Sequence, residues 1–191
     1  MRHLVKSEQS EILTKGLKYK DGNSYNNAKI RAILIAEQGG FCAYTEKYID
    51  SITSVDVEHF NDRLKNTDED NYYNWYAVLH WLNNRKVSIN SYLPILHPYE
   101  NASQKRVHYQ NGVYQVVNAG DTEAQNLIDF LQLNRYELHH ERMNGIKRVK
   151  YLLEILGGID QLKTYLQIDQ SSLSFFTALE AELDLDLSDL I

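Results

Sequence analysis

The sequence predicts an α+β protein in which a small two-stranded unit is embedded in a mainly helical domain and is followed by a separate β-hairpin. Three observations predict this class. Two runs rich in aromatic and aliphatic residues, 55–60 and 74–81, are separated by a polar stretch and followed by a short helical segment. The dipeptide Asn111-Gly112 joins two further β-rich runs, as in a type I′ hairpin. Helical apolar spacing fills most of the remaining chain.

The first segment, residues 1–25, is expected to form an arm that packs over the body of the protein, and a frayed terminus is the alternative. A more strongly patterned helix follows. Either Asn26 or Asn27 is expected to cap it, because a side-chain oxygen there can accept from a free backbone N–H. The pair Gly39-Gly40 is expected to end it in a left-handed conformation.

The C-terminal part predicts further helices after the hairpin. Two capping-box patterns, Thr122 with Gln125 and Asn134 with Glu137, mark where two of them begin. The second helix is expected to cover 135–156 and to stop at a glycine pair. Two shorter helices are expected over 160–166 and 172–183.

Length and composition indicate one domain, or a small catalytic unit with a helical appendage, in 191 residues of which 43% are hydrophobic. We expect a division at residue 106: an arm, a helix and the two-stranded unit in 1–106, and the hairpin, helices and an acidic tail in 107–191. No apolar run approaches the ~20 residues needed to span a bilayer, and the first residues lack a signal-peptide core. A cytoplasmic protein with no membrane partner is therefore expected.

The charge distribution limits nucleic-acid binding to a local surface. A net charge of −6 argues against a free-standing, non-specific DNA-binding protein, since phosphate contacts require clustered Lys and Arg. The negative charge is concentrated at the C-terminal end, where six acidic residues and no base follow Lys163. The remaining chain has 20 acidic and 20 basic residues. The acidic, Leu-rich end suits a docking tail, and a solvated, partly disordered end is the alternative.

Candidate chemistry gathers around the two-stranded unit. Glu58 and His59 are adjacent at the end of its first run, and Asn83 follows its second run. A carboxylate, a carboxamide and a histidine supply what metal-assisted phosphodiester hydrolysis needs, namely oxygen ligands for a divalent cation and a base that activates water. Because neighbouring residues of a regular strand point to opposite faces, a twist or bulge is expected at Phe60-Asn61.

The order and spacing of these residues resemble the motif of HNH endonucleases, also called His-Me finger nucleases. In that motif an acidic-His pair ends one strand, here Glu58-His59, followed by a middle Asn, here Asn74, and a His or Asn beside the next helix, here Asn83. The chain resembles the small HNH nucleases encoded beside an ATPase in Septu-type and retron-linked anti-phage systems. The stretches MRHLVKSEQSEILT, EQGGFCAYTEKYI and DTEAQNLIDFLQLNRYELHHER extend the resemblance over roughly residues 1–150.

The resemblance implies a ββα-metal core and a role for each motif residue. Glu58 and Asn83 would hold a single Mg²⁺ or Mn²⁺, and Asn83 would also cap a short helix. His59 would be the general base, and Asn74 would pin the loop by hydrogen bonds to backbone and so aim the base. Each residue also has a purely structural alternative. Glu58 could be an ordinary strand residue and Asn83 a helix cap, while His59 could be a hydrogen-bonded surface histidine and Asn74 a turn residue at the start of the strand.

Basic residues near the motif are candidates for holding the phosphate backbone: Arg63, Lys65, Arg85 and Lys86. Each could instead be an ordinary solvated side chain. The partners implied by the resemblance are DNA and an ATPase of the structural-maintenance (SMC) or ABC type, with a retron reverse transcriptase and its RNA–DNA as an optional further partner.

A structural zinc is not expected. Related HNH domains carry two Cys-x-x-Cys pairs, but here Cys42 alone is kept, and Thr45, Leu79 and Leu82 stand at the other positions. A zinc site contributes roughly 10–16 kcal/mol of coupled binding and folding, whereas burying a leucine contributes about 1.5–3 kcal/mol. Leu79 and Leu82 are expected to replace part of the missing zinc stabilisation by apolar packing. One cysteine also excludes a disulfide within the chain.

Two functions follow from these residues. The first is a metal-dependent HNH DNA endonuclease, the effector subunit of an anti-phage defence system. The second is a catalytically degenerate HNH-fold subunit that serves as a binding or structural module. RNA or tRNA is a further possible substrate.

Overall fold

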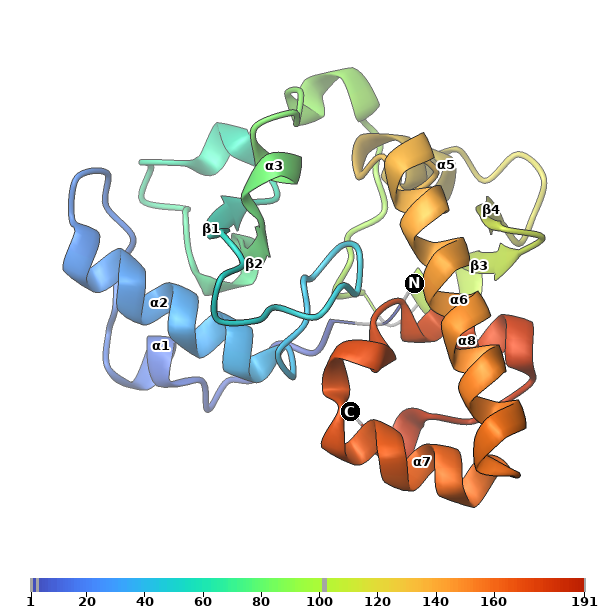
Figure 1. Cartoon of the computed structure of the whole chain (residues 1–191). Coiled ribbons are helices and arrows are strands. Elements are labelled where there is room, and N and C mark those ends of the chain that lie inside the picture. Colours follow the sequence, from blue (N-terminus) through green and yellow to red (C-terminus); the bar gives the residue numbers. More distant parts are fainter. Residues whose placement is uncertain (1, 3, 101–102, 191) are drawn as a thin grey trace.

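The computed structural model describes residues 2, 4–100 and 103–190. Helices surround two small antiparallel sheets, so the α+β class is confirmed (Figure 1). In chain order the elements are α1 (Glu11–Thr14), α2 (Ser24–Glu37), β1 (Val55–His59), β2 (Trp75–Leu79), α3 (His80–Asn83), α4 (Ser103–Arg106), β3 (Val107–Gln110), β4 (Val113–Val116), α5 (Thr122–Phe130), α6 (Tyr136–Leu156), α7 (Ile159–Ile168) and α8 (Phe176–Leu183).

The N-terminal segment packs over the body as expected. Leu4 and Ile12 are buried, and the Lys6 ammonium donates to the backbone carbonyl of Trp75. The same ammonium lies 4.2 Å from the ring centroid of Tyr76. These contacts anchor residues near the chain start to the second strand of the two-stranded unit.

Helix α2 begins three residues earlier than predicted, so the assignment of its cap to Asn26 or Asn27 was wrong. The cap is Asn23, whose side chain accepts from the backbone N–H of Asn26 at 3.1 Å. Asn27 instead donates to the backbone carbonyl of Lys20. Several asparagines stand near this helix start, and the preceding turn decides which one caps it. The predicted stop is confirmed, because both following glycines have positive φ.

Strands β1 and β2 pair antiparallel without interruption, from Val55 opposite Leu79 to His59 opposite Trp75. No bulge therefore lies within these five pairs. Helix α2 covers one face of the pair, where Ile30 packs in a small apolar cluster with residues of both strands. Helix α3 follows β2 directly, and Asn83 is its last residue, so the prediction that Asn83 caps its start was wrong.

The hairpin of β3 and β4 is confirmed at the predicted turn. Asn111 and Gly112 have φ of 51° and 85°, as a type I′ turn requires. Two capping predictions beyond it were wrong. Asp121, not Thr122, caps α5 by accepting from Ala124. The Asn134 side chain bonds both backbone groups of Tyr114, which ties the start of α6 to β4 instead of capping the helix.

One main apolar core joins the two halves of the chain. Phe60 packs edge-to-face on Phe130, with ring centroids 5.4 Å apart. The division at residue 106 stays a prediction. Leu187 is fully buried in this core, so the described part of the acidic end packs on the body. Within the described ranges, no helix has the length and apolar character to cross a membrane.

Candidate active site

A polar cleft of about 510 Å³ lies at the end of β1. The strand, the following loop and the segment after α3 contribute most of its walls. It gathers three of the four motif residues: Glu58, His59 and Asn83. It also gathers acidic and basic side chains from other elements: Arg31, Asp56, Asp62, Lys65 and Lys86. The cleft is therefore the place where the predicted chemistry converges.

The two residues of the acidic-His pair reach the cleft from opposite sides of the strand end. Glu58 contacts Lys86, whereas His59 contacts Tyr19 and Asp70. Side chains alternate along the regular ladder, as expected for β structure. Both side chains border the cleft because it surrounds the end of the strand.

His59 is paired with Asp70, a residue of the loop that follows β1. The distance from His59 Nε2 to Asp70 Oδ2 is 3.0 Å, and both side chains are buried. Burial raises the pKa of Asp70, but hydrogen bonds and charge contributed by His59, Asn74 and Trp75 outweigh it and hold the pKa below its usual range. Asp70 is thus poised to stay ionised beside the imidazole.

Asn74 lies behind this pair and outside the cleft lining. Its side-chain oxygen accepts from the backbone N–H of Asn61 at 2.8 Å, and its amide donates to Asn61 O and to Asp70 Oδ1. These are the loop-pinning backbone bonds expected of it, and they also fix Asp70. The catalytic part of its assignment stays a prediction.

Glu58 is buried, with Lys86 as its partner. The Lys86 ammonium donates to Glu58 Oε1 and to the backbone carbonyls of His59, at 2.6 Å, and Phe60, at 2.9 Å. Burial raises the pKa of Glu58 above its ordinary value, and the nearby Lys86 charge offsets this only in part. The predicted phosphate-binding Lys86 is thus engaged by oxygen atoms of the chain itself.

Asn83 lines the same cleft as Glu58 but has a different bonding partner. Its amide nitrogen donates to Asp56 Oδ2 at 2.9 Å, and the same oxygen lies 2.8 Å from His80 Nδ1. Among the side chains that the structure describes, no group of three His, Cys, Asp or Glu is placed to hold a metal ion. The bond to Asp56 uses the amide nitrogen of Asn83 and not its oxygen, and the oxygen donors of Glu58 and Asn83 are of the kind that Mg²⁺ prefers, so their assignment as ligands stays a prediction.

Two of the four predicted phosphate contacts, Lys65 and Lys86, line the cleft, and the other two do not. Lys65 lines the cleft and lies 3.2 Å from Asp21. Arg63 is exposed outside the cleft lining, and Arg85 stacks over Trp81 and approaches Glu137 at 3.5 Å. Arg31, which the sequence did not single out, lines the cleft from α2.

The four positions compared above with zinc-binding cysteines are buried. Cys42, Leu79 and Leu82 belong to the main core, and Thr45 is buried beside it. Apolar packing of the two leucines is therefore confirmed.

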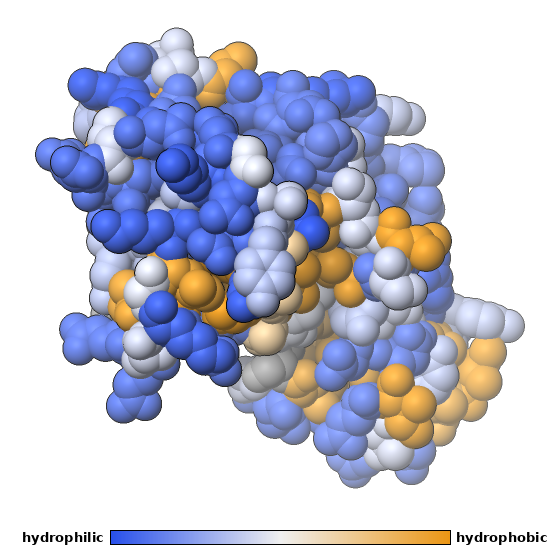
Figure 2. Space-filling view, turned by 90° about the vertical axis from the view of Figure 1, so that its left-hand side faces the viewer, coloured by the Kyte–Doolittle hydropathy of each residue, from blue (hydrophilic) through white to orange (hydrophobic). Residues whose placement is uncertain are grey.

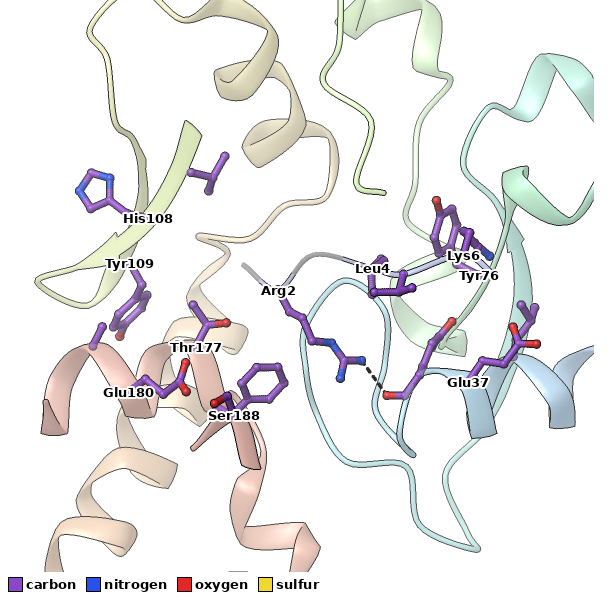
Figure 3. Close-up of a pocket in the computed structure, with 16 residues that line it drawn as sticks. Arg2, Leu4, Lys6, Glu37, Tyr76, His108, Tyr109, Thr177, Glu180 and Ser188 are labelled. Atoms are coloured by element: carbon purple, nitrogen blue, oxygen red, sulfur yellow. Dashed lines mark hydrogen bonds between the residues drawn. The ribbon is translucent and has the colours of Figure 1, made fainter. Parts of the chain in front are cut away.

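A larger cavity, about 770 Å³, lies elsewhere, between the N-terminal arm, α2, β3 and α8. Figure 3 shows Lys6 and Glu37 on one side of it, Thr177 and Glu180 on the other side, and Arg2 between them. Arg2 donates to Gln38 O at 2.7 Å, and burial lowers the pKa of Lys6 to about 7, against the opposing charge of Glu37. These cations hold the arm in place.

The surface around the arm and α2 differs from the polar cleft. Figure 2 shows apolar surface across the middle of this face, below a largely hydrophilic upper part.

Comparisons with known proteins found no match: no family model matches the chain, and neither a curated protein nor a solved structure matches it.

Proposed function

We propose that the chain is an HNH-type endonuclease that hydrolyses phosphodiester bonds in DNA, with β1, β2 and α3 as its ββα core. One observation carries the proposal: His59 and Asp70 form a buried pair at the edge of a cleft that also contains Glu58 and Asn83. Three cationic side chains line the same cleft, Arg31, Lys65 and Lys86, and suit a phosphate backbone.

In this mechanism His59 removes a proton from the attacking water. Asp70 keeps the imidazole in place and stabilises the positive charge that it gains, because opposite charges at 3.0 Å attract strongly in a buried setting. Asn74 acts indirectly, since its amide holds both Asp70 and the loop backbone at Asn61. Arg31 and Lys65 steer and hold the phosphates on either side of the scissile bond.

The resemblance also implies Mg²⁺ or Mn²⁺ held by Glu58 and Asn83. In the arrangement described, the Lys86 ammonium donates to Glu58, whereas Asn83 uses its amide nitrogen toward Asp56 and not the oxygen that would face an ion, so an ion held by this pair would have to replace the Lys86 ammonium. No step above depends on a metal.

A partner would complete the function. The cations of the cleft are few and the chain carries a net charge of −6, which favours delivery of DNA by another protein. We propose an ATPase of the SMC or ABC type in a defence system, with or without a retron reverse transcriptase and its RNA–DNA, on the strength of the family resemblance.

A second candidate is a degenerate HNH-fold subunit that binds without cleaving. The observation that favours it is the Lys86 ammonium, which donates to the carboxylate of the predicted metal ligand Glu58. In that case the cleft would be a structural remnant, and the chain would contribute only to assembly.

The test is nicking of supercoiled plasmid by the complex of the chain with its ATPase, in Mg²⁺ and in Mn²⁺, with RNA and tRNA as parallel substrates. His59→Ala should reduce DNA cleavage by about 10²–10⁴-fold, the usual contribution of a general base. His140→Ala is the matched control, because His140 is exposed on α6 and does not line the cleft. Equal cleavage by wild type and His59→Ala contradicts the mechanism, and a complex without cleavage supports the second candidate.

A further inference from the structure

Lys86 occupies a cradle of three oxygen atoms at the end of β1. Its ammonium contacts the Glu58 carboxylate and the backbone carbonyls of His59 and Phe60, and only 10% of its side chain is exposed. The three donors of a lysine ammonium are thereby matched by three acceptors. Lys86, which lies on a connecting segment, is therefore largely buried in the wall of the cleft.

The cradle has the composition of a hard-cation site. Carboxylate and backbone carbonyl oxygens are the ligands that Mg²⁺, Mn²⁺ and Ca²⁺ take in proteins. An ammonium and a divalent ion cannot share the same three oxygen atoms, since both need their lone pairs and both carry positive charge. Whichever cation is present excludes the other.

We propose that Lys86 is a tethered competitor for a divalent cation: Glu58 and the carbonyls of His59 and Phe60 form the cation site, and the Lys86 ammonium closes it. This site shares Glu58 with the predicted pair and differs from it in its other two ligands, which are the backbone carbonyls that contact Lys86. It concerns cation binding and does not require that the chain cleaves DNA.

Lys86 is placed so that it can leave without unfolding a helix or strand. It lies in the connection between α3 and the 3-10 helix Ile89–Tyr92. Its ammonium borders the polar cleft, where a phosphate group would offer it an alternative anion. If the proposed nuclease function holds, substrate binding and opening of the cation site are therefore linked through this one side chain.

The first experiment measures Mn²⁺ binding to the full chain by electron paramagnetic resonance. Lys86→Met should bind Mn²⁺ at least about tenfold more tightly than wild type, because a site that is closed ~90% of the time loses that factor in apparent affinity. Lys65→Met is the matched control: it removes the same charge from the same cleft but does not touch Glu58. Adding Glu58→Gln to Lys86→Met should abolish the gain.

A second measurement uses the wild-type chain, so that the proposal stays testable if Lys86→Met fails to fold. Acylation of the Lys86 amine, followed by mass spectrometry, should increase when Mn²⁺ displaces it into the cleft. Unchanged Lys86 labelling at saturating Mn²⁺ overturns the proposal, as does equal tightening of Mn²⁺ binding by Lys86→Met and Lys65→Met. Neither readout depends on cleavage, so loss of the nuclease proposal and loss of this one are separate outcomes.

Discussion

The region around β1 and the region after residue 106 are stabilised by different interactions. At β1 the buried side chains include Glu58 and His59, each paired with a charged partner beside a cleft. After residue 106 the interior is almost entirely apolar, and the buried charged side chain among the described residues there is Arg142. Its guanidinium donates to Leu133 O at 2.7 Å and lies over the rings of Tyr109 and Tyr114.

The difference indicates where stability comes from and where chemistry can occur. A buried ion pair adds little net stability, because desolvation offsets the attraction. Apolar burial contributes steadily, at roughly 25 cal/mol per Å². We infer that the helices after residue 106 stabilise the fold, so that the β1 region can keep charged groups whose environments shift their pKa values, which is typical of functional sites.

The largest effect on stability is expected from Lys86→Met. It leaves the Glu58 carboxylate and two backbone carbonyls without their donor, and breaking a buried pair in this way costs about 3–5 kcal/mol. Urea denaturation measures the free energy of unfolding. Lys65→Met, whose pair with Asp21 is exposed, should have no measurable effect. If both variants are equally stable, the Lys86 contacts do not stabilise the site.

Leu127→Ala tests the apolar region. Leu127 is fully buried in α5, so its truncation should lower the free energy of unfolding by about 2–5 kcal/mol, through lost burial and a cavity. The cleft should keep its Mn²⁺ and DNA binding in the folded fraction. Ile168→Ala is the control, because 84% of Ile168 is exposed. A Leu127→Ala variant as stable as Ile168→Ala would remove the contrast between the two regions.

Features fixed by local chemistry could be predicted from the sequence. The turn at Asn111-Gly112 needs positive φ at both positions, and Asn and Gly are the residues that adopt positive φ most readily. The stop of α6 at Gly157 is of the same kind. Helix starts were less predictable, because Asn, Asp and Thr cluster there and tertiary contacts, such as that of Asn134 with Tyr114, decide their roles.

The composition of the site could be predicted only in part. Glu58, His59 and Asn83 line one cleft, as their spacing in the sequence indicates. Their spacing does not predict which group each side chain bonds. Asp70 is one of several acids in the loop before β2, and nothing local distinguishes it from Asp68 or Glu69. The capture of Glu58 by Lys86 joins residues 28 positions apart. Such pairings depend on the folded path of the chain.

Gly112→Ala is expected to have a smaller effect in the apolar region. A residue with a Cβ is strained at φ of 85°, by about 1–2 kcal/mol, and the added methyl group would lie 2.8 Å from His139 Cε1. Gly120→Ala is a matched control, since Gly120 has φ of 88° and open space around it. Thermal denaturation should therefore show a larger loss for Gly112→Ala. Equal losses would mean that the His139 side chain moves aside freely.

The smallest expected effect is a pair of opposite pH dependences within the β1 region. The folded pKa of Glu58 is raised, so the folded state binds more protons than the unfolded state just above the usual value of about 4.3, and stability falls as pH rises there. The folded pKa of Asp70 is lowered, so its contribution is present above about 3.9 and is lost as pH falls toward the folded value.

Glu58→Gln should therefore make the free energy of unfolding fall less, or rise more, as pH increases above about 4.3, whereas Asp70→Asn should remove part of the loss on the acid side. Urea denaturation at intervals from about pH 3 to 7 measures both slopes on the same scale. Shifts of the same sign in the two variants would mean that the Lys86 charge, and not burial, dominates at Glu58. Folding would then lower the pKa of both carboxylates. This result would contradict the raised pKa of Glu58 and remove the difference between Glu58 and Asp70.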